Sequence, residues 1–160
     1  MSALPVRLLL PVAALLAAGG IGIAAYLTVV HYAHQPIACS SIGDCELVNS
    51  SKYAKLAGVP VAVLGLLSYV TMLLLVVAAW LRRDTTALTL AWGTGVASFG
   101  FSMYLTWIEV GVLDAICVYC VASASVVTAM LAALSACVWF ARAELFGDGQ
   151  ALPSVVVEGK

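Results

Sequence analysis

Two pairs of cysteines are the residues in this chain whose type and spacing could carry out redox chemistry. Five residues separate Cys39 from Cys45, and two separate Cys117 from Cys120. On a helix, positions i and i+3 share a face, so the sulfurs of Cys117 and Cys120 can close a small, strained disulfide ring. If this pair begins a helix, the free amide groups of the first turn favour a thiolate at Cys117 and lower its pKa. The two pairs together are typical of a dithiol–disulfide electron relay.

The chain that must position these cysteines is far too apolar for a soluble domain. Hydrophobic residues make up 64% of its 160 residues and charged residues only 9%, and the mean hydropathy is +1.10. A helix that crosses a bilayer needs ~20 apolar residues, so the chain has room for about four such helices. The chain contains no basic or acidic tract that would predict a nucleic acid partner. The composition therefore predicts an integral membrane protein that lies in the lipid bilayer.

Four apolar runs predict an all-α fold, a four-transmembrane-helix bundle within residues 1–143. The first run could imitate a cleaved signal peptide, because Arg7 precedes an alanine-rich stretch. The apolar core of such a peptide is only ~7–15 residues long, however, which favours a membrane span. We predict helices at about 8–30, 58–81, 86–108 and 115–141, one long exoplasmic loop at 31–57, and a disordered cytoplasmic tail at 144–160.

The distribution of basic residues predicts the orientation of the bundle. Cytoplasmic loops of membrane proteins carry an excess of Lys and Arg. If the N-terminus is cytoplasmic, five of the seven basic residues lie inside and only Lys52 and Lys55 lie outside, so we predict an N-in, C-in topology. Both cysteine pairs then lie at the exoplasmic face, where disulfides persist. Cys137 would lie about 25 Å from Cys120 along the fourth helix, at ~1.5 Å per residue, and we expect it to be a small buried hydrophobe.

The position of Cys120, one turn into an apolar helix, predicts that its electrons leave within the membrane. A quinone is apolar, lipid-soluble and accepts the two electrons that a dithiol releases when it becomes a disulfide. The sequence contains no flavin, haem or nicotinamide motif that could take these electrons instead. We therefore expect a membrane quinone as the electron acceptor and no metal.

Other interpretations of the same residues remain open at this stage. Four cysteines could hold a zinc ion, but a tetrathiolate site usually repeats the CxxC spacing, which Cys39 and Cys45 lack. His31 and His34 share a helical face without a third nearby ligand, so we interpret them as interfacial polar residues. Alternatively, two structural disulfides could staple a non-catalytic membrane scaffold. Structural disulfides resist mild reductants, whereas the disulfides of a relay exchange readily.

Motifs in both halves of the chain resemble the vitamin K epoxide reductase family and its bacterial homologues. The first half contains the cysteine pair with five intervening residues, a serine six residues further on, and a Gly-Val-Pro segment that leads to another glycine. The second half contains polar and aromatic positions in the third helix, followed by the CxxC ten residues after a tryptophan. The residues that carry the resemblance are Cys39, Cys45, Ser51, Gly58, Val59, Pro60, Gly65, Ser98, Gly100, Tyr104, Leu105, Trp107, Cys117 and Cys120.

The resemblance implies a four-helix bundle that surrounds a quinone, with the loop as a lid and electron shuttle. Cys39 would exchange with a protein substrate, and Cys45 would form a transient disulfide with Cys117. Cys120 would be the thiolate next to the quinone. The resemblance also implies roles for residues around the pocket: Ser51 and Tyr53 would orient the lid and the quinone, and Leu105 and Leu113 would line the pocket.

Two departures from the family pattern favour plain quinone reduction over epoxide reduction. Val61, which would also contact the quinone, aligns with an asparagine that hydrogen-bonds the substrate oxygen in many members. Ala124 aligns with a tyrosine of animal members. A vitamin K epoxide or quinone reductase remains the alternative.

Many bacterial homologues carry a fused thioredoxin-like domain, for which these 160 residues leave no room. We therefore expect a separate exported thioredoxin-fold thiol oxidase of the DsbA type as partner. Ubiquinone or menaquinone would be the acceptor, in a bacterial cell (inner) membrane.

Overall fold

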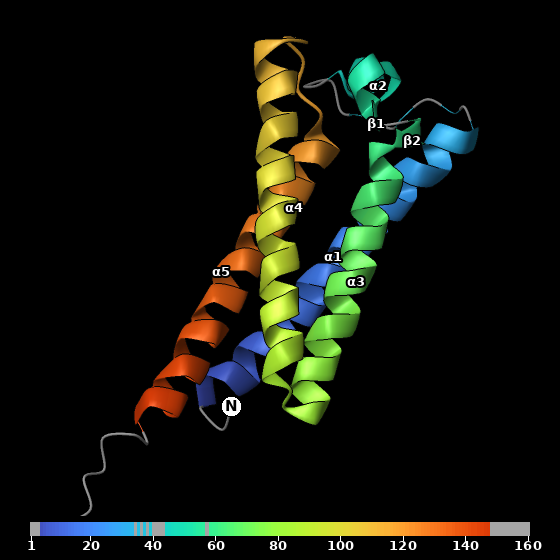
Figure 1. The fold of residues 1–160 in the computed structure, drawn as a ribbon. Helices are drawn as coiled ribbons and strands as arrows, with labels where there is room; N and C mark the ends of the chain where they lie inside the picture. Colours follow the sequence, from blue (N-terminus) through green and yellow to red (C-terminus); the bar gives the residue numbers. More distant parts are fainter. Residues whose placement is uncertain are drawn as a thin grey trace, which may run out of the picture.

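Long helices dominate the computed structural model, which describes residues 4–33, 35, 37, 39, 44–56 and 58–147, with side chains as far as residue 142. Four of them form a bundle, and the short elements gather at one of its ends (Figure 1). In chain order the elements are α1 (Leu4–Ala33), α2 (Cys45–Ser50), the 3-10 helix η1 (Lys52–Ala54), β1 (Lys55–Leu56), β2 (Val59–Pro60), α3 (Val61–Arg82), α4 (Thr85–Gly111) and α5 (Val118–Gly147).

Within the described part of the chain, α1, α3 and α5 are long and apolar enough to cross a membrane, so this is a multi-pass membrane protein. The fourth long helix, α4, packs against both α3 and α5. It is less apolar because several of its residues are Gly, Ser or Thr, among them Thr94, Ser98 and Ser102. Such small polar side chains are common where membrane helices pack closely. That α4 also spans the membrane stays a prediction.

The helix boundaries differ from the apolar runs by a few residues because local chemistry decides where each helix ends. The helix predicted from residue 58 begins at Val61, since Val59 and Pro60 pair with Leu56 and Lys55 in an antiparallel hairpin. The last helix continues to Gly147, so the expectation of disorder from residue 144 is wrong for 144–147. Glu and Leu in that stretch favour helix. Residues 148–160 lie outside the described residues.

The predicted loop at 31–57 contains more regular structure than the sequence indicated. Its described residues include α2, η1 and β1. These elements are too short to show a helical or strand period in the sequence. They lie over one end of the bundle, beside the beginning of α3 (Figure 1).

The bundle core is built from two clusters of buried side chains. One cluster contains Leu10, Leu88 and Leu134 from three different helices, and the other contains Tyr69, Met72 and Met130. Because both clusters join several helices, they fix how the helices cross and therefore where the first turn of α5 lies. Cys137 is fully buried in the first cluster, which confirms the prediction that it is a small core residue.

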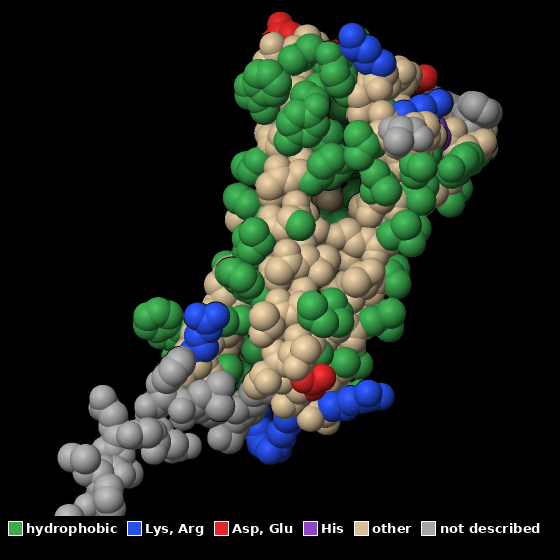
Figure 2. Space-filling model, in the orientation of Figure 1, with side chains coloured by type: hydrophobic (Ala, Val, Ile, Leu, Met, Phe, Trp, Pro, Cys, Tyr) green, Lys and Arg blue, Asp and Glu red, His purple; other side chains and the backbone are tan. Residues whose placement is uncertain are grey.

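The two ends of the bundle differ in charge and in chemistry. The N-terminal end of α1, the turn between α3 and α4, and the C-terminal end of α5 lie together (Figure 1). Basic side chains gather at this end, while the opposite end, with Lys52 and Lys55 next to β1, carries fewer (Figure 2). Cys45 at the start of α2, with its disulfide partner Cys39, and the CxxC at the start of α5 lie at that opposite end. Which side of the membrane each end faces stays a prediction.

Candidate active site

The CxxC pair lies at the beginning of α5. Val118 is the first helical residue, so Cys117 immediately precedes the helix and Cys120 lies in its first turn. The carbonyl oxygen of Cys117 accepts a hydrogen bond from the Val121 N–H at 3.0 Å. Cys117 therefore occupies the position that the sequence argument required for a stabilised thiolate.

The environment of Cys117 favours its ionised form. The Cys120 thiol donates a hydrogen bond to the Cys117 sulfur, and this bond is the main reason that the pKa of Cys117 falls to about 7. Burial and the nearby charge of Glu109 oppose the shift, whereas the backbone N–H groups of Tyr119 and Cys120 add to it. A thiolate is the form that attacks disulfides. Near neutral pH, Cys117 can therefore act as a nucleophile towards another sulfur.

Glu109, near the C-terminal end of α4, is the one charged side chain that is buried among the described residues, with 4% of its surface exposed. Its Oε2 accepts a hydrogen bond from the Cys117 N–H at 3.3 Å. Its carboxylate is also an acceptor for the single S–H of Cys120, in competition with the Cys117 sulfur. Our sequence reasoning missed this residue as part of the site. The available signal was a lone carboxylate at the end of an apolar run, eight residues before the CxxC.

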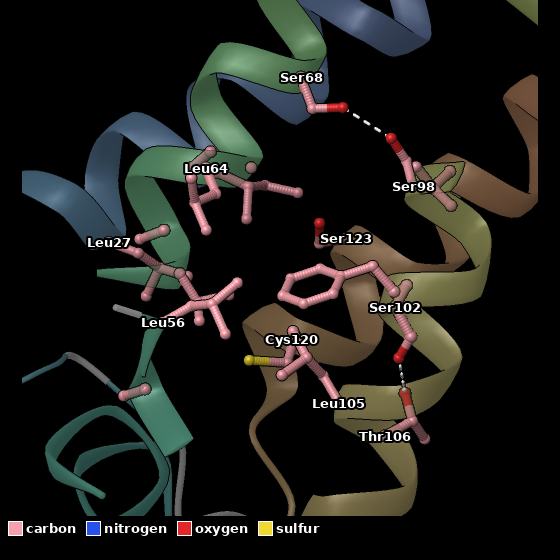
Figure 3. A pocket seen from close by; sticks show the side chains of 18 of the residues that line it. Leu27, Leu56, Leu64, Ser68, Ser98, Ser102, Leu105, Thr106, Cys120 and Ser123 are labelled. Carbon is pink, nitrogen blue, oxygen red and sulfur yellow. Dashed lines mark hydrogen bonds between the residues drawn. The ribbon is translucent and has the colours of Figure 1, made fainter. Parts of the chain in front are cut away.

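A cavity of about 420 Å³ opens beside Cys120 between the four long helices and the segment from Val48 to Leu56. The Cys120 sulfur projects from α5 into this space, with Leu56 and Leu105 nearby (Figure 3). Most of the wall is aliphatic or aromatic. Every residue that the sequence predicted to contact a quinone lies on the wall, namely Ser51, Tyr53, Val61, Leu105, Leu113 and Cys120.

Hydroxyl groups interrupt the apolar wall at two places that sequence reasoning did not identify as a site. Ser68 and Ser98 hydrogen-bond each other at 2.6 Å across α3 and α4. The Tyr69 hydroxyl donates to the Ser123 carbonyl oxygen at 2.9 Å and lies at 2.9 Å from its Oγ. Ser123 follows Cys120 by one helical turn, so this spacing was the signal that could have found it. These hydroxyls partner one another between helices and leave the cavity predominantly apolar.

A family model for the vitamin K epoxide reductase family matches residues 11–135. The chain belongs to this family. It is therefore a membrane oxidoreductase, related to proteins that work with quinones and thioredoxin-like partners. The matched region contains both cysteine pairs and the whole cavity wall.

In this vitamin K epoxide reductase family member, the two cysteine pairs stand in different redox states. Cys39 and Cys45 form a disulfide with a Cα–Cα distance of 6.3 Å. Cys45 is buried at the start of α2, while Cys117 and Cys120 are free thiols. Neither Cys39, Cys45 nor Cys117 lies on the cavity wall. The structure thus separates an oxidised pair outside the bundle from a reduced pair of which only Cys120 faces the cavity.

The described residues bring together no group of three or more His, Cys, Asp or Glu side chains that could hold a metal ion. The His31 ring contacts Tyr32 edge-on, with 5.7 Å between ring centroids. His34, which the sequence paired with His31, lies outside the described residues.

Proposed function

We propose that this protein is a thiol:quinone oxidoreductase, which oxidises a separate thioredoxin-fold partner of the DsbA type and passes two electrons to a membrane quinone. This activity would support disulfide formation in exported proteins. One observation carries the proposal: the Cys120 thiol opens into an apolar cavity (Figure 3), while its CxxC partner, Cys117, is not among the residues that line that cavity. The pair can thus exchange electrons with sulfur on one side and with an apolar acceptor on the other.

The proposed relay runs through the four cysteines in a fixed order. A dithiol of the partner reduces the Cys39–Cys45 disulfide by attack on Cys39, and the partner leaves with its own disulfide. The thiolate of Cys45 then exchanges with Cys117 of an oxidised CxxC, which reduces that pair and restores the loop disulfide. The structure corresponds to the stage that follows, with the loop pair oxidised and the CxxC reduced. Each exchange breaks one S–S bond and forms another, so electrons balance at every step.

The cavity has the size and lining that a quinone head group requires. Small-molecule sites typically occupy ~300–1,000 Å³ and are mostly apolar with a few placed polar groups. Here aliphatic and aromatic side chains from four helices form the wall, and Ser51 and Tyr53 contribute polar atoms from the segment next to the hairpin. When bound, a quinone supplies the two-electron acceptor. Cys120 is the only cysteine on the wall and would be the thiol that faces it.

The proposed topology places this end of the bundle on the exoplasmic side of a bacterial cell membrane, with four membrane crossings and both termini inside. It is supported by the division of basic residues between the two ends (Figure 2). A disulfide at Cys39 and Cys45 is also expected to persist only in an oxidising compartment.

Val61 bears on the choice between quinone and epoxide as the physiological substrate. It lies on the cavity wall, where its aliphatic side chain offers no hydrogen bond to a substrate oxygen. In many family members the asparagine that aligns with Val61 hydrogen-bonds the substrate oxygen, a contact that valine cannot make. The wall at Val61 therefore favours plain quinone reduction.

Anaerobic quinone reduction by the purified protein in detergent tests this function, with either a reduced thioredoxin-fold protein or a small dithiol as electron donor. We expect Cys120→Ala to abolish turnover with both donors. Cys39→Ala should lose turnover with the protein donor and keep it with the small dithiol, which can reduce the CxxC directly. Cys137→Ala is the matched control, because this cysteine lies in the core away from the cavity wall.

If the wild type shows no turnover and its thiol pairs resist mild reductant, the proposal fails in favour of the stapled scaffold. Equal and negligible effects of Cys120→Ala and Cys39→Ala would also refute the relay. If the wild type forms hydroquinone with the small dithiol but not with the thioredoxin-fold protein, the alternative of a vitamin K quinone reductase would replace the protein-oxidising role.

A further inference from the structure

The buried carboxyl of Glu109 has no role in the relay of sulfurs described above. It lies on the cavity wall beside Cys120 and is almost completely removed from solvent. Burying a carboxyl group is unfavourable unless it has partners that hydrogen-bond it. Here both partners belong to the CxxC: the Cys117 N–H and the Cys120 thiol.

The groups around Glu109 make it the available proton acceptor for the reacting thiol. None of the described residues on the cavity wall is a Lys, Arg or His, and the other titratable groups on it are Tyr53 from η1, Tyr69 from α3 and Cys120 from α5. A phenol already carries a proton on its oxygen, whereas a carboxylate only accepts. Among the described residues on this wall, Glu109 is thus the side chain whose carboxylate can accept the Cys120 proton.

We propose that Glu109 carries the proton of Cys120 to the substrate during quinone reduction, an inference that rests on the function proposed above. The S–H bond of Cys120 breaks as its proton moves to the Glu109 carboxylate, and the S–S bond between Cys117 and Cys120 forms. Two electrons pass to the quinone. Glu109 would then give the proton to a quinone oxygen and return to its carboxylate form.

The proton balance of this step closes without an additional reactant. The overall reaction converts two thiols and a quinone into a disulfide and a hydroquinone. One proton travels from Cys120 through Glu109. The second comes from the solvent, into which Cys117 releases its own proton when it ionises.

A purely structural role for Glu109 would be to hold the beginning of α5 through its hydrogen bond with the Cys117 N–H, which joins α4 to α5. Glu109→Gln separates this role from proton transfer, because the amide oxygen still accepts from that N–H but cannot accept a proton from a thiol. Glu109→Asp retains the acid and shortens its reach. Asp114→Asn is the matched control, since it also replaces a carboxylate by an amide, at an exposed residue in the connection between α4 and α5.

The test is single-turnover reduction of a water-soluble quinone analogue by each variant after its cysteines have been reduced, with the rate measured from pH 5 to 9. General acid–base groups typically contribute ~10²–10⁴-fold to a rate. We expect Glu109→Gln to slow the step by at least 10²-fold and to abolish the part of the pH profile that depends on the carboxyl. Glu109→Asp should recover part of the rate, and Asp114→Asn should behave as wild type.

A rate for Glu109→Gln within about 3-fold of wild type, with an unchanged pH profile, would overturn the proton-transfer role while leaving the oxidoreductase proposal intact. A Glu109→Gln protein that fails to fold is recognised by its loss of thermal transition, and Glu109→Asp then decides the question through its pH profile. By contrast, absence of quinone reduction in the wild type would refute the proposed function itself.

Discussion

Gly20 in α1 is the position where adding a single methyl group should disturb the active site. A Cβ atom at Gly20 would lie 2.5 Å from both Cδ1 and Cζ of the Tyr69 ring, so the ring must move. That ring is buried and is held by its hydroxyl at Ser123. We therefore expect Gly20→Ala to displace Tyr69 from the cavity wall and to weaken its hydrogen bond with α5.

The size of the effect follows from opposing contributions. Replacing Gly by Ala inside a helix normally stabilises by ~1 kcal/mol. Overpacking a filled core costs ~1–3 kcal/mol, and losing the Tyr69 hydrogen bond costs about 1 kcal/mol more. The net expectation is a destabilisation of about 1–3 kcal/mol for Gly20→Ala. The neighbouring Gly19 has nothing within 4 Å of its hypothetical Cβ, so Gly19→Ala should be neutral or stabilising.

Thermal unfolding in one detergent, followed by tryptophan fluorescence at a single scan rate, measures this difference. Gly20→Ala should unfold at a lower temperature than wild type and Gly19→Ala should not. In a Tyr69→Leu background, which removes the ring, the cost of Gly20→Ala should largely disappear. In a quinone reduction assay, Gly20→Ala should raise KM because Tyr69 lies on the wall.

The reasoning is refuted if Gly20→Ala is as stable as Gly19→Ala. It is also refuted if the penalty for Gly20→Ala persists unchanged in the Tyr69→Leu background, because the ring would then not be the group that the methyl displaces.

Three further predictions concern a thiolate, a buried sulfur and a helix cap. With a pKa of about 7, Cys117 should be about half ionised at pH 7, so its rate of alkylation by iodoacetamide should rise between pH 6 and 8. In Cys120→Ala this rise should move towards the ordinary cysteine pKa of ~8.5. An unchanged pH profile would contradict the role of the Cys120 thiol. Cys137→Ser should leave turnover intact while costing about 1 kcal/mol of stability, because a hydroxyl replaces a fully buried sulfur; an inactive variant would show that the two ends of the bundle are coupled. Asp84→Ala should cost about 1 kcal/mol in thermal unfolding, since the Asp84 side chain accepts from the Thr86 N–H at 2.8 Å, and Asp84→Asn should retain most of that stability.

The long helices could be predicted from the sequence because each consists of an almost continuous run of apolar residues. Such a run is visible in the composition alone. The boundaries were less accurate, as Val61 and Gly147 show, because turn chemistry and helix propensity change the ends by a few residues. The hairpin of β1 and β2 gave no signal, since two-residue strands have no period. The fourth helix was predicted from about residue 115 but begins at Val118, so Cys117 precedes its first turn, which is the condition that the thiolate argument required.

By itself the sequence determined that this is a membrane protein of helices with two cysteine pairs at one end, because composition, charge and spacing are properties of the chain alone. It also indicated, through its family resemblance, which residues surround the cavity. The tertiary structure alone decided which groups face Cys120: it brought Glu109 from α4 against the CxxC and Tyr69 from α3 against Ser123. Contacts between helices depend on how those helices cross, and that is fixed by packing across the whole bundle rather than by any local pattern.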